Sequence, residues 1–281
     1  MAKVPVVGTV LDGTDLKNDR RARLGIGRDD YRVPPGLYAV GKPENTSPVM
    51  VTANYKLTFD CLRSELSGIN AWIVVIDTKG INVWCAAGKG TFGTNELTGR
   101  INALRLRRIV SHNVLMLPQL GAPGVAAHEV FKQCGFRVVY GPLRAEDIKE
   151  FLDNGMKATD EMRRIRFGLR ERAVLVPIEL LHNLKPVLAA YILLLVLNLV
   201  FGGHRTFAGA AGTAALNFIP LLSAFVIGCA AVPLLLPWIP FRAFAMKGLL
   251  LGLIPGALVL LFPGAFGYSG TGRLVQLSHP S

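Results

Sequence analysis

The residues best suited to chemistry form one short stretch, Asn82-Val83-Trp84-Cys85-Ala86-Ala87-Gly88-Lys89. Its most reactive side chain is the thiol of Cys85. Asn82 is a good N-cap, because its side-chain oxygen can accept a hydrogen bond from a first-turn backbone N–H. Gly90 can supply the left-handed residue that closes a helix. The stretch therefore predicts a short helix with Cys85 in its first turn, where the helix dipole favours the thiolate, the form that ligates metals.

The neighbours of Cys85 predict how this helix is placed and used. Residues 71–76 are apolar, rich in Val and Ile, and followed by turn residues, so they indicate a buried strand whose carboxyl end the helix caps. Ala86, Ala87 and Gly88 would give the helix a smooth surface that a large flat ligand can approach closely. Trp84 is expected to pack beneath the helix as an anchor, and Lys89 suits its C-terminal end.

Three interpretations of the stretch compete. The first is a buried helix with an inert thiol, since free Cys is among the most buried residue types. The second is a phosphate loop over residues 88–91, but Val83 and Gly90 occupy positions where the Walker pattern requires Gly and Ser or Thr. The third is a metal ligand, Cys85, presented to a planar cofactor.

The stretch resembles the cap-helix signature of the mercury-methylating corrinoid proteins, N-[VI]-W-C-A-A-G-K, without a mismatch. The flanking segments 51–56, 77–81 and 90–94 match that family as well. The resemblance covers about residues 40–265. More distantly, the soluble part is similar to the corrinoid-binding domain of the corrinoid iron–sulfur protein of acetyl-CoA synthesis.

The resemblance implies a cobalamin-type corrinoid held base-off, with Cys85 as the lower axial ligand to cobalt. It implies a corrinoid-dependent methyltransferase that passes a methyl group from cobalt to inorganic Hg(II), forming methylmercury. The motif and the loops at the strand ends together give the expected cofactor-binding residues: Thr52, Ala53, Asn54, Thr78, Gly80, Asn82, Val83, Trp84, Ala86, Ala87, Gly88, Lys89, Thr91, Gly93, Thr94, Gln119, Leu120, Gly121 and Ala122.

The partners follow from the cysteines and from the family. The four cysteines are scattered without C-x-x-C spacing, which disfavours a zinc site, a self-contained iron–sulfur cluster and a disulfide framework. Electrons must then come from a partner, and the family pattern supplies a ferredoxin-like protein with two [4Fe–4S] clusters. A methyltetrahydrofolate pathway is the expected methyl donor. His128 has no partner at metal spacing, so we expect it to be an ordinary surface or core residue.

The pattern around this stretch predicts a Rossmann-like α/β domain. Strands are expected at residues 48–53, 71–76, 114–117 and 137–140, and helices at 55–66, 94–107, 124–134 and 145–154. Such alternation indicates a parallel sheet with helices on both faces, which binds ligands beyond the carboxyl ends of its strands. Loops 52–54, 78–80, 118–122 and 141–144 lie there. Any one of them could simply make a turn, but four on one rim favour a ligand platform.

The remaining sequence predicts a membrane protein. Residues 1–47 are expected to be an irregular lead-in, 48–158 the corrinoid-binding domain, 159–185 a basic interfacial linker helix, and 186–281 an all-α transmembrane domain. Spans are expected at about 186–203, 216–240 and 247–267, each with the ~20 apolar residues that a bilayer requires. The resembling family has five spans, so a shortened homologue or a fragment is expected. The arginines before the first span place the soluble domain in the cytoplasm and residues 202–209 outside.

Composition agrees with that organisation. The formal charge is +12 and the mean hydropathy is +0.39, a pairing that favours membrane-flanking Lys and Arg over nucleic-acid binding. Residues 1–10 have no long apolar run, so no N-terminal signal peptide is expected.

Two other functions stay open. The first is a membrane-tethered corrinoid methyl carrier of one-carbon metabolism in the acetyl-CoA pathway, for which mercury would be incidental. The second is a transporter, which the spans alone suggest and the lack of paired intramembrane charges disfavours.

Overall fold

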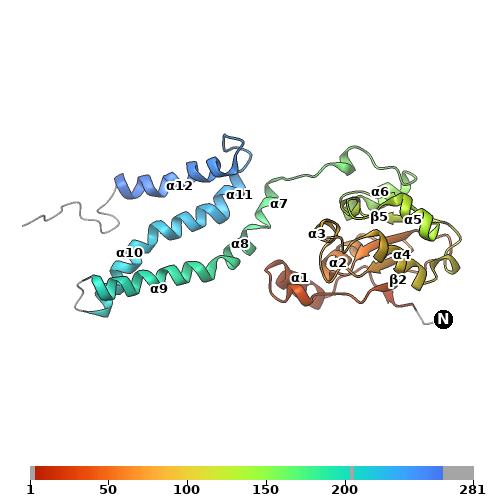
Figure 1. Ribbon diagram of the computed structural model, residues 1–281, viewed down its shortest axis with the longest axis horizontal. Helices are drawn as coiled ribbons and strands as arrows, with labels where there is room; N and C mark the ends of the chain where they lie inside the picture. Colours follow the sequence, from red (N-terminus) through yellow and green to blue (C-terminus); the bar gives the residue numbers. More distant parts are fainter. Residues whose placement is uncertain (1–3, 203–205, 262–281) are drawn as a thin grey trace, which may run out of the picture. The chain divides into compact units, whose positions relative to one another are not determined.

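The computed structural model describes residues 4–202 and 206–261, and the chain divides into two compact units, Met1–Ile165 and Arg166–Ser281 (Figure 1). The first unit is an α/β domain, and the second is helical. Each unit is described by itself below.

The first unit contains a six-stranded sheet with the strand order β1-β2-β4-β3-β5-β6. Adjacent strands are parallel throughout, with the exception of β2 and β4, which are antiparallel. The strands are β1 (Val6–Val7), β2 (Gly36–Val40), β3 (Val49–Ala53), β4 (Ala71–Ile76), β5 (Val114–Leu117) and β6 (Arg137–Tyr140). The expected parallel sheet is confirmed for β3 to β6, and the sheet gains an unexpected strand, β2, which pairs with β4 antiparallel.

Helices cover both faces of this sheet (Figure 1). Side chains alternate along the strands: Val49, Val51 and Ala53 pack on one face, whereas Met50 packs on the other. The first face is covered by α3 (Val83–Gly88), α4 (Thr94–Ala103) and α5 (Ala127–Cys134), and the second by α2 (Lys56–Ser64) and α6 (Ile148–Asp153). Short 3-10 turns occur at η2 (Leu106–Arg108), η3 (Gln119–Gly121), η4 (Ala145–Asp147) and η5 (Glu161–Arg163).

The expectation of an irregular N-terminal lead-in is wrong. Residues 4–40 contain β1, α1 (Gly13–Arg23), a 3-10 turn η1 (Arg28–Asp30) and β2, and they belong to the same compact unit as the rest of the sheet. Helix α1 begins with a capping box in which Asp12 and Asp15 bond each other's backbone N–H groups. Two strands of the sheet, β1 and β2, therefore come from this segment, whose polar composition gives no clear strand pattern.

The strand order creates a switch point. From β3 the chain passes through α2 to β4 on one side, and later returns to β5 on the other side of β3. The connecting helices accordingly leave on opposite faces of the sheet at this position. In open α/β sheets, ligands bind outside the carboxyl ends of the strands at such a point.

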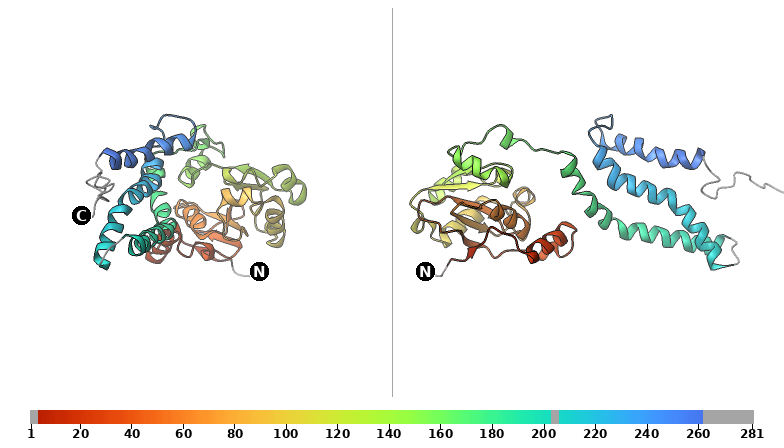
Figure 2. Two further views of the ribbon diagram at one scale, coloured as in Figure 1. Left: turned by 60° about the vertical axis from the view of Figure 1, so that its left-hand side comes forward. Right: turned by 180° about the vertical axis from the view of Figure 1, so that it is seen from behind.

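The second unit consists of helices α7 (Leu169–Ala173), α8 (Val176–His182), α9 (Leu184–Phe201), α10 (Phe207–Val226), a π-helical turn (Ile227–Ala231), α11 (Val232–Leu235) and α12 (Phe244–Leu261). Helix α10 packs against both α9 and α12 (Figure 2). The single linker helix expected over 159–185 is wrong, because residues 164–168 are not helical and α7 and α8 are separate short helices.

Two helices of this unit are long and apolar enough to cross a membrane, Leu184–Phe201 and Phe207–Leu235. Both expose apolar side chains along their length, among them Ile192, Leu193 and Ile219. The apolar part of α12, Phe244–Ala257, is shorter. Part of the expected third span, and residues 203–205 of the loop expected outside, lie outside the described residues.

Candidate functional site

Helix α3 carries Cys85 at the carboxyl edge of the sheet. The Asn82 side chain caps the helix, because its Oδ1 accepts a hydrogen bond of 2.9 Å from the backbone N–H of Cys85. Gly90 follows with φ +77°, the left-handed conformation that ends a helix. The expected cap and stop of this helix are both confirmed.

The two faces of α3 differ from the expectation. Ala86 and Ala87 are 0% and 6% exposed and pack into the core, so their side chains are not offered to a ligand. Trp84, expected beneath the helix, is instead 67% exposed, and Val83 anchors the helix in its place. The exposed face therefore presents Trp84, Cys85, Gly88 and Lys89, and a side chain added at Gly88 would meet open space.

A cleft of about 460 Å³ lies next to this exposed face, at the switch point of the sheet. We call it the switch-point cleft. Thr52 of β3, Leu117 of β5, and Asn82, Val83 and Trp84 from the start of α3 all line it. Helices α2 and α6 supply its side walls through residues such as Leu57, Cys61, Leu62 and Ile148, and the loops after β5 and β6 contribute Pro118, Leu120, Gly141, Pro142, Leu143 and Arg144.

Several residues that were expected to contact a ligand instead form hydrogen bonds within the loops. Asn54 is 3% exposed, and its Oδ1 accepts hydrogen bonds from the Thr78 backbone N–H (3.0 Å), the Thr78 hydroxyl (2.8 Å) and the Gly80 N–H (2.9 Å). Its Nδ2 donates to Asp77 at 3.0 Å. This network joins the carboxyl ends of β3 and β4, and it fixes the loop that leads into α3.

The loops after α3 show the same pattern. The Thr94 hydroxyl accepts a hydrogen bond of 2.9 Å from the Ala126 N–H, and the Thr91 hydroxyl donates to the Ala86 carbonyl at 3.4 Å. Gly93 is the N-cap of α4. Gly121 packs so closely that an added Cβ would lie 2.5 Å from Cε1 of Phe92. Thr91 therefore bonds α3 itself, whereas Gly93, Thr94 and Gly121 serve the packing of the segments that follow it.

The remaining residues that were expected to bind the cofactor differ in their positions. Leu120 lines the switch-point cleft, Ala53 is fully buried, and Ala122 is exposed. Gln119 accepts a hydrogen bond of 2.8 Å from Nη1 of Arg163. His128 is exposed, with its Nε2 3.4 Å from the carboxylate of Glu129.

Sequence reasoning missed part of the cleft. Arg23 and Arg28 line it from the N-terminal segment that was expected to be irregular, and Cys61 lines it from α2. Tyr55 lines it too, although it was identified only as part of a matching flank. Its ring is 3% exposed, and its hydroxyl has no hydrogen-bond partner among the described residues. An orphaned buried hydroxyl could not be foreseen without the packing around it.

The residues present fit a large planar cofactor whose metal a thiol can ligate. The Cys85 thiol is exposed on a capped helix, and the space above Gly88 is open. Beside it lies a cleft with apolar walls and an unsatisfied hydroxyl. A corrinoid fits such a combination, because a thiol is one of the donors that can ligate cobalt and the cleft offers apolar and hydrogen-bonding contacts for the side groups of the ring.

Comparisons with known proteins find similarity to subunits of acetyl-CoA-forming complexes over part of the first unit. Residues 27–152 match the sequence family described as the CO dehydrogenase/acetyl-CoA synthase delta subunit. The acetyl-CoA decarbonylase/synthase complex subunit gamma of Methanopyrus kandleri is 33% identical over 128 residues, 45% of this chain and 27% of that protein. That of Archaeoglobus fulgidus is 31% identical over 128 residues, with the same two shares.

The gamma 2 subunit of Methanosarcina thermophila is 32% identical over 120 residues, 41% of this chain and 25% of that protein. This chain thus spans about a quarter of the length of the curated relatives it matches. The matched family segment begins at residue 27, so it includes β2 to β6, α3 and the Cys85 helix. Over the candidate site, the chain is similar to subunits of acetyl-CoA decarbonylase/synthase complexes.

Proposed function

We propose that this chain is a membrane-tethered corrinoid protein that carries a methyl group in the one-carbon metabolism of the acetyl-CoA pathway. The observation that carries the proposal is the exposed Cys85 thiol, held on α3 beside the switch-point cleft. The similarity of residues 27–152 to acetyl-CoA decarbonylase/synthase subunits supports the methyl-carrier role. The two long apolar helices support the tether.

Each part of α3 has a definite task in this proposal. Cys85 would ligate the cobalt, and Trp84 and Gly88 would border the cofactor on the same exposed face. The Asn82 side chain fixes the backbone of Cys85 by accepting a 2.9 Å hydrogen bond from its N–H, while Ala86 and Ala87 pack the helix against the core. When bound, the corrinoid would supply a cobalt ion that accepts and releases the methyl group.

The reductant and the methyl donor would come from partners. Cys61 lies on α2 and Cys134 on α5, which cover opposite faces of the sheet, and Cys229 belongs to the second unit. These positions do not assemble the four cysteines of an iron–sulfur cluster. We therefore propose a ferredoxin-like partner with two [4Fe–4S] clusters as reductant and a methyltetrahydrofolate pathway as donor.

Inorganic Hg(II) is a second candidate acceptor, favoured by one specific observation. The stretch from Asn82 to Lys89 matches the mercury-methylation signature without a mismatch. Hg(II) is a soft electrophile, so it requires a methyl group of carbanion or radical character. A strongly donating thiolate ligand favours that polarity, because axial ligands set the electron density on a metal cofactor.

The test begins with ligation. Purified full-length protein would be loaded with cobalamin, and visible and EPR spectra would be recorded for the wild type, Cys85→Ala and the control Cys229→Ala. We expect the signature of thiolate ligation to be lost in Cys85→Ala alone. Methyl transfer should fall by more than ~100-fold in this variant, since even the outer-shell partners of metal ligands are worth 10–100-fold.

A second assay separates the acceptors. Methyl-loaded protein would be offered either Hg(II) or the acceptor complex of acetyl-CoA synthesis, and the methylated products would be quantified. Transfer to the acceptor complex alone would rule out mercury methylation, whereas transfer to Hg(II) alone would rule out the carrier role. Near-wild-type transfer by Cys85→Ala to either acceptor would show that Cys85 is not the axial ligand.

A further inference from the structure

Arg172 carries a buried charge that no acidic side chain of the described residues neutralises. It lies on α7 and is 3% exposed, yet its Nη1 has no hydrogen-bond partner among the described residues. Its Nε donates to the Gly168 carbonyl at 3.1 Å, and its guanidinium lies 5.1 Å from the centroid of the Trp238 ring. Both partners are neutral, and none of the salt bridges between described residues includes Arg172. A buried charge without a counter-ion costs free energy, which an anionic ligand would recover.

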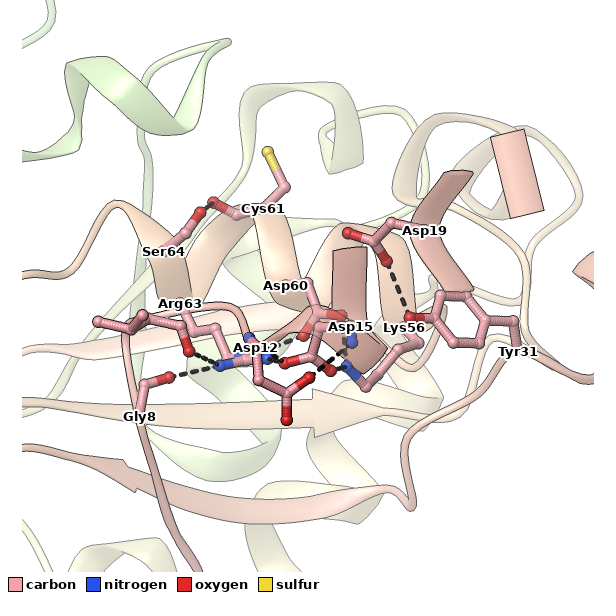
Figure 3. A network of polar contacts seen from close by, with 11 residues as sticks. Gly8, Asp12, Asp15, Asp19, Tyr31, Lys56, Asp60, Cys61, Arg63 and Ser64 are labelled. Carbon is pink, nitrogen blue, oxygen red and sulfur yellow. Dashed lines mark hydrogen bonds and ion pairs between the residues drawn. The ribbon is translucent and has the colours of Figure 1, made fainter. Parts of the chain in front are cut away.

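Arg63 of α2 shows how the first unit neutralises a charge of the same kind. Arg63 and Arg172 are the two arginines that are buried within the described part of the chain. Figure 3 shows the Arg63 guanidinium among acidic partners: Asp60, to which its Nε donates at 2.7 Å, and Asp15. The Gly8 carbonyl accepts a further hydrogen bond of 2.6 Å from it. Since the described residues supply counter-ions for Arg63 and none for Arg172, we expect the counter-ion of Arg172 to come from outside the chain.

The position of Arg172 suits the headgroup layer of a bilayer. The two long apolar helices, Leu184–Phe201 and Phe207–Leu235, follow each other in the chain, so they would cross a bilayer in opposite directions. The start of the first helix and the end of the second would then reach the same membrane surface. Helix α7 packs against α11, which forms the end of the second helix (Figure 1). Arg172 is therefore expected at the level where the apolar helices end and the phosphate groups of lipids begin.

Trp238 contributes the second side chain, from the segment that follows α11. This segment is held in place by Lys247, whose Nζ donates to the Leu236 carbonyl at 2.6 Å, and by Ile239, which is 7% exposed. The Trp238 ring itself is 65% exposed, so it contacts the Arg172 guanidinium without being packed in a core. Tryptophan rings favour membrane interfaces, and this one can turn aside to admit an anion without disturbing the helices.

The surroundings of Arg172 favour a lipid over a free anion. A guanidinium binds phosphate oxygens through paired hydrogen bonds. Exposed apolar side chains belong to both segments of the site, among them Val174 on α7 and Phe241 after α11. Free phosphate would leave these side chains in water, whereas acyl chains would cover them. We infer that Arg172 and Trp238 form a binding site for the phosphate of a membrane phospholipid, whose acyl chains lie against the neighbouring apolar side chains.

This site rests on the membrane tether of the proposed function and does not depend on the corrinoid. The experiment uses the full-length protein in a nonionic detergent and three probes: dioctanoylphosphatidylglycerol, dioctanoylglycerol, which has the same chains without a phosphate, and inorganic phosphate. Native mass spectrometry counts the bound molecules and gives their dissociation constants. We expect the protein to bind phosphatidylglycerol more tightly than either of the other two probes.

The variants separate the site from the general basic charge around it. Arg172→Gln should weaken phosphatidylglycerol binding ~10-fold or more, because it removes charged hydrogen bonds to the phosphate. Arg172→Lys keeps the charge but not the paired geometry, so it should weaken binding by a smaller factor. Arg170→Gln is the matched control, since it removes the same charge from an exposed position of the same helix, and it should weaken binding no more than ~3-fold.

The melting temperature distinguishes a ligand-binding arginine from a structural one. Arg172→Met removes an uncompensated buried charge, so without lipid this variant should melt at or above the temperature of the wild type. Added phosphatidylglycerol should raise the melting temperature of the wild type and leave that of Arg172→Met unchanged, because only the protein that binds the lipid is stabilised by it. An Arg172→Met protein that melts lower than the wild type, and is stabilised by the lipid as much as the wild type is, would overturn the inference.

The probes identify the ligand. Binding of inorganic phosphate as tight as that of phosphatidylglycerol, and equally dependent on Arg172, would mean a site for a free anion and would refute the lipid. Equal binding of dioctanoylglycerol would show that the phosphate is not recognised, and equal loss in Arg172→Gln and Arg170→Gln would reduce the site to general charge. The tether is checked separately: recovery of the protein in the soluble fraction of lysed cells would refute the tether, whatever the lipid titrations give.

Discussion

At the scale of single residues, the six residues of α3 fall into two sets with different roles. Val83, Ala86 and Ala87 are buried, and Trp84, Cys85 and Gly88 are exposed. Residues three and four apart share a helix face, so Cys85 and Gly88 stand together on the side that meets solvent. The small residues of the motif therefore serve two needs: the two alanines allow close packing on the core, and the glycine leaves space beside the thiol.

This division predicts opposite effects for two leucine substitutions. Gly88→Leu should keep the fold, because an added side chain there meets open space, and should abolish corrinoid binding by filling the face beside Cys85. Ala86→Leu should instead destabilise the protein by about 1–3 kcal/mol, since Ala86 is 0% exposed in a packed core. Spectroscopic titration with cobalamin and thermal unfolding would measure both. Normal corrinoid binding by a folded Gly88→Leu protein would show that the cofactor lies elsewhere.

The residue scale also shows what the sequence could not reveal. Asn54, Thr78 and Gly80 have the hydrogen-bonding and small side chains that suit a ligand platform, and they do lie at strand ends. Their polar groups are used within the protein, because Asn54 Oδ1 accepts three hydrogen bonds from residues 78 and 80. A polar residue at a strand end can bond either a ligand or the neighbouring loop. The residue type does not tell which, and only the geometry distinguishes the two.

At the scale of elements, helix α1 depends on charge more than on apolar packing. Its buried residues are Asp19 and Ala22, and it is tied to α2 through Asp15. Burial disfavours the charged form of Asp15, but hydrogen bonds from Lys56 and Arg63 outweigh it and lower its pKa from 3.8 to about 2. A carboxylate whose pKa falls on folding stabilises the folded state above its unfolded value and loses that effect as the pH drops.

The expected result is an acid-sensitive attachment of α1. The contribution of Asp15 should be complete above about pH 4 and should disappear as the pH falls toward about 2. Asp15→Asn should cost about 1–3 kcal/mol at neutral pH, because it leaves the buried Arg63 and the partly buried Lys56 with one carboxylate fewer. Urea unfolding between pH 2 and 7 measures both effects. Asp30→Asn, at an exposed position, is the control, and an identical pH slope for Asp15→Asn and the wild type would contradict the prediction.

Elements with a strong repeating pattern were predicted well from sequence. The strands at 71–76, 114–117 and 137–140 coincide with β4, β5 and β6, because short apolar runs bounded by turns have few other solutions. Strand β2 was missed because its pairing with β4 is long-range and its flanks are polar. Helix α1 was missed although its capping-box residues, Asp12 and Asp15, are visible in the sequence. Its sequence is mostly polar and has no apolar residues at helical spacing that would indicate a helix.

At the scale of the whole molecule, the second unit carries the features from which the location of the first is proposed. Helices α9 and α10 expose apolar side chains that only lipid or another protein would cover. The arginines before α9 and the pair Arg242 and Lys247 before and within α12 are expected on the cytoplasmic side. That side also holds the reductants that the proposed methyl cycle requires.

Labelling of intact cells tests this topology. A cysteine at Gly202, after α9, should react with a membrane-impermeant thiol reagent, and one at Ala243, before α12, should react only after lysis. A Cys229→Ala background limits labelling from within the membrane unit. The reverse pattern would place the first unit outside the cell and remove its supply of low-potential electrons.

The antiparallel strand β2 has one more consequence, for anyone who isolates the first unit. Strand β4 consists of six consecutive apolar residues, Ala71–Ile76, and β2 covers one of its edges. A fragment that begins at residue 48 would keep the cysteine helix but leave that edge open, with no charge or proline to block pairing with another molecule. We expect such a fragment to aggregate into intermolecular β-sheet, whereas one that begins at residue 4 and ends at residue 165 should elute as a single species in size-exclusion chromatography.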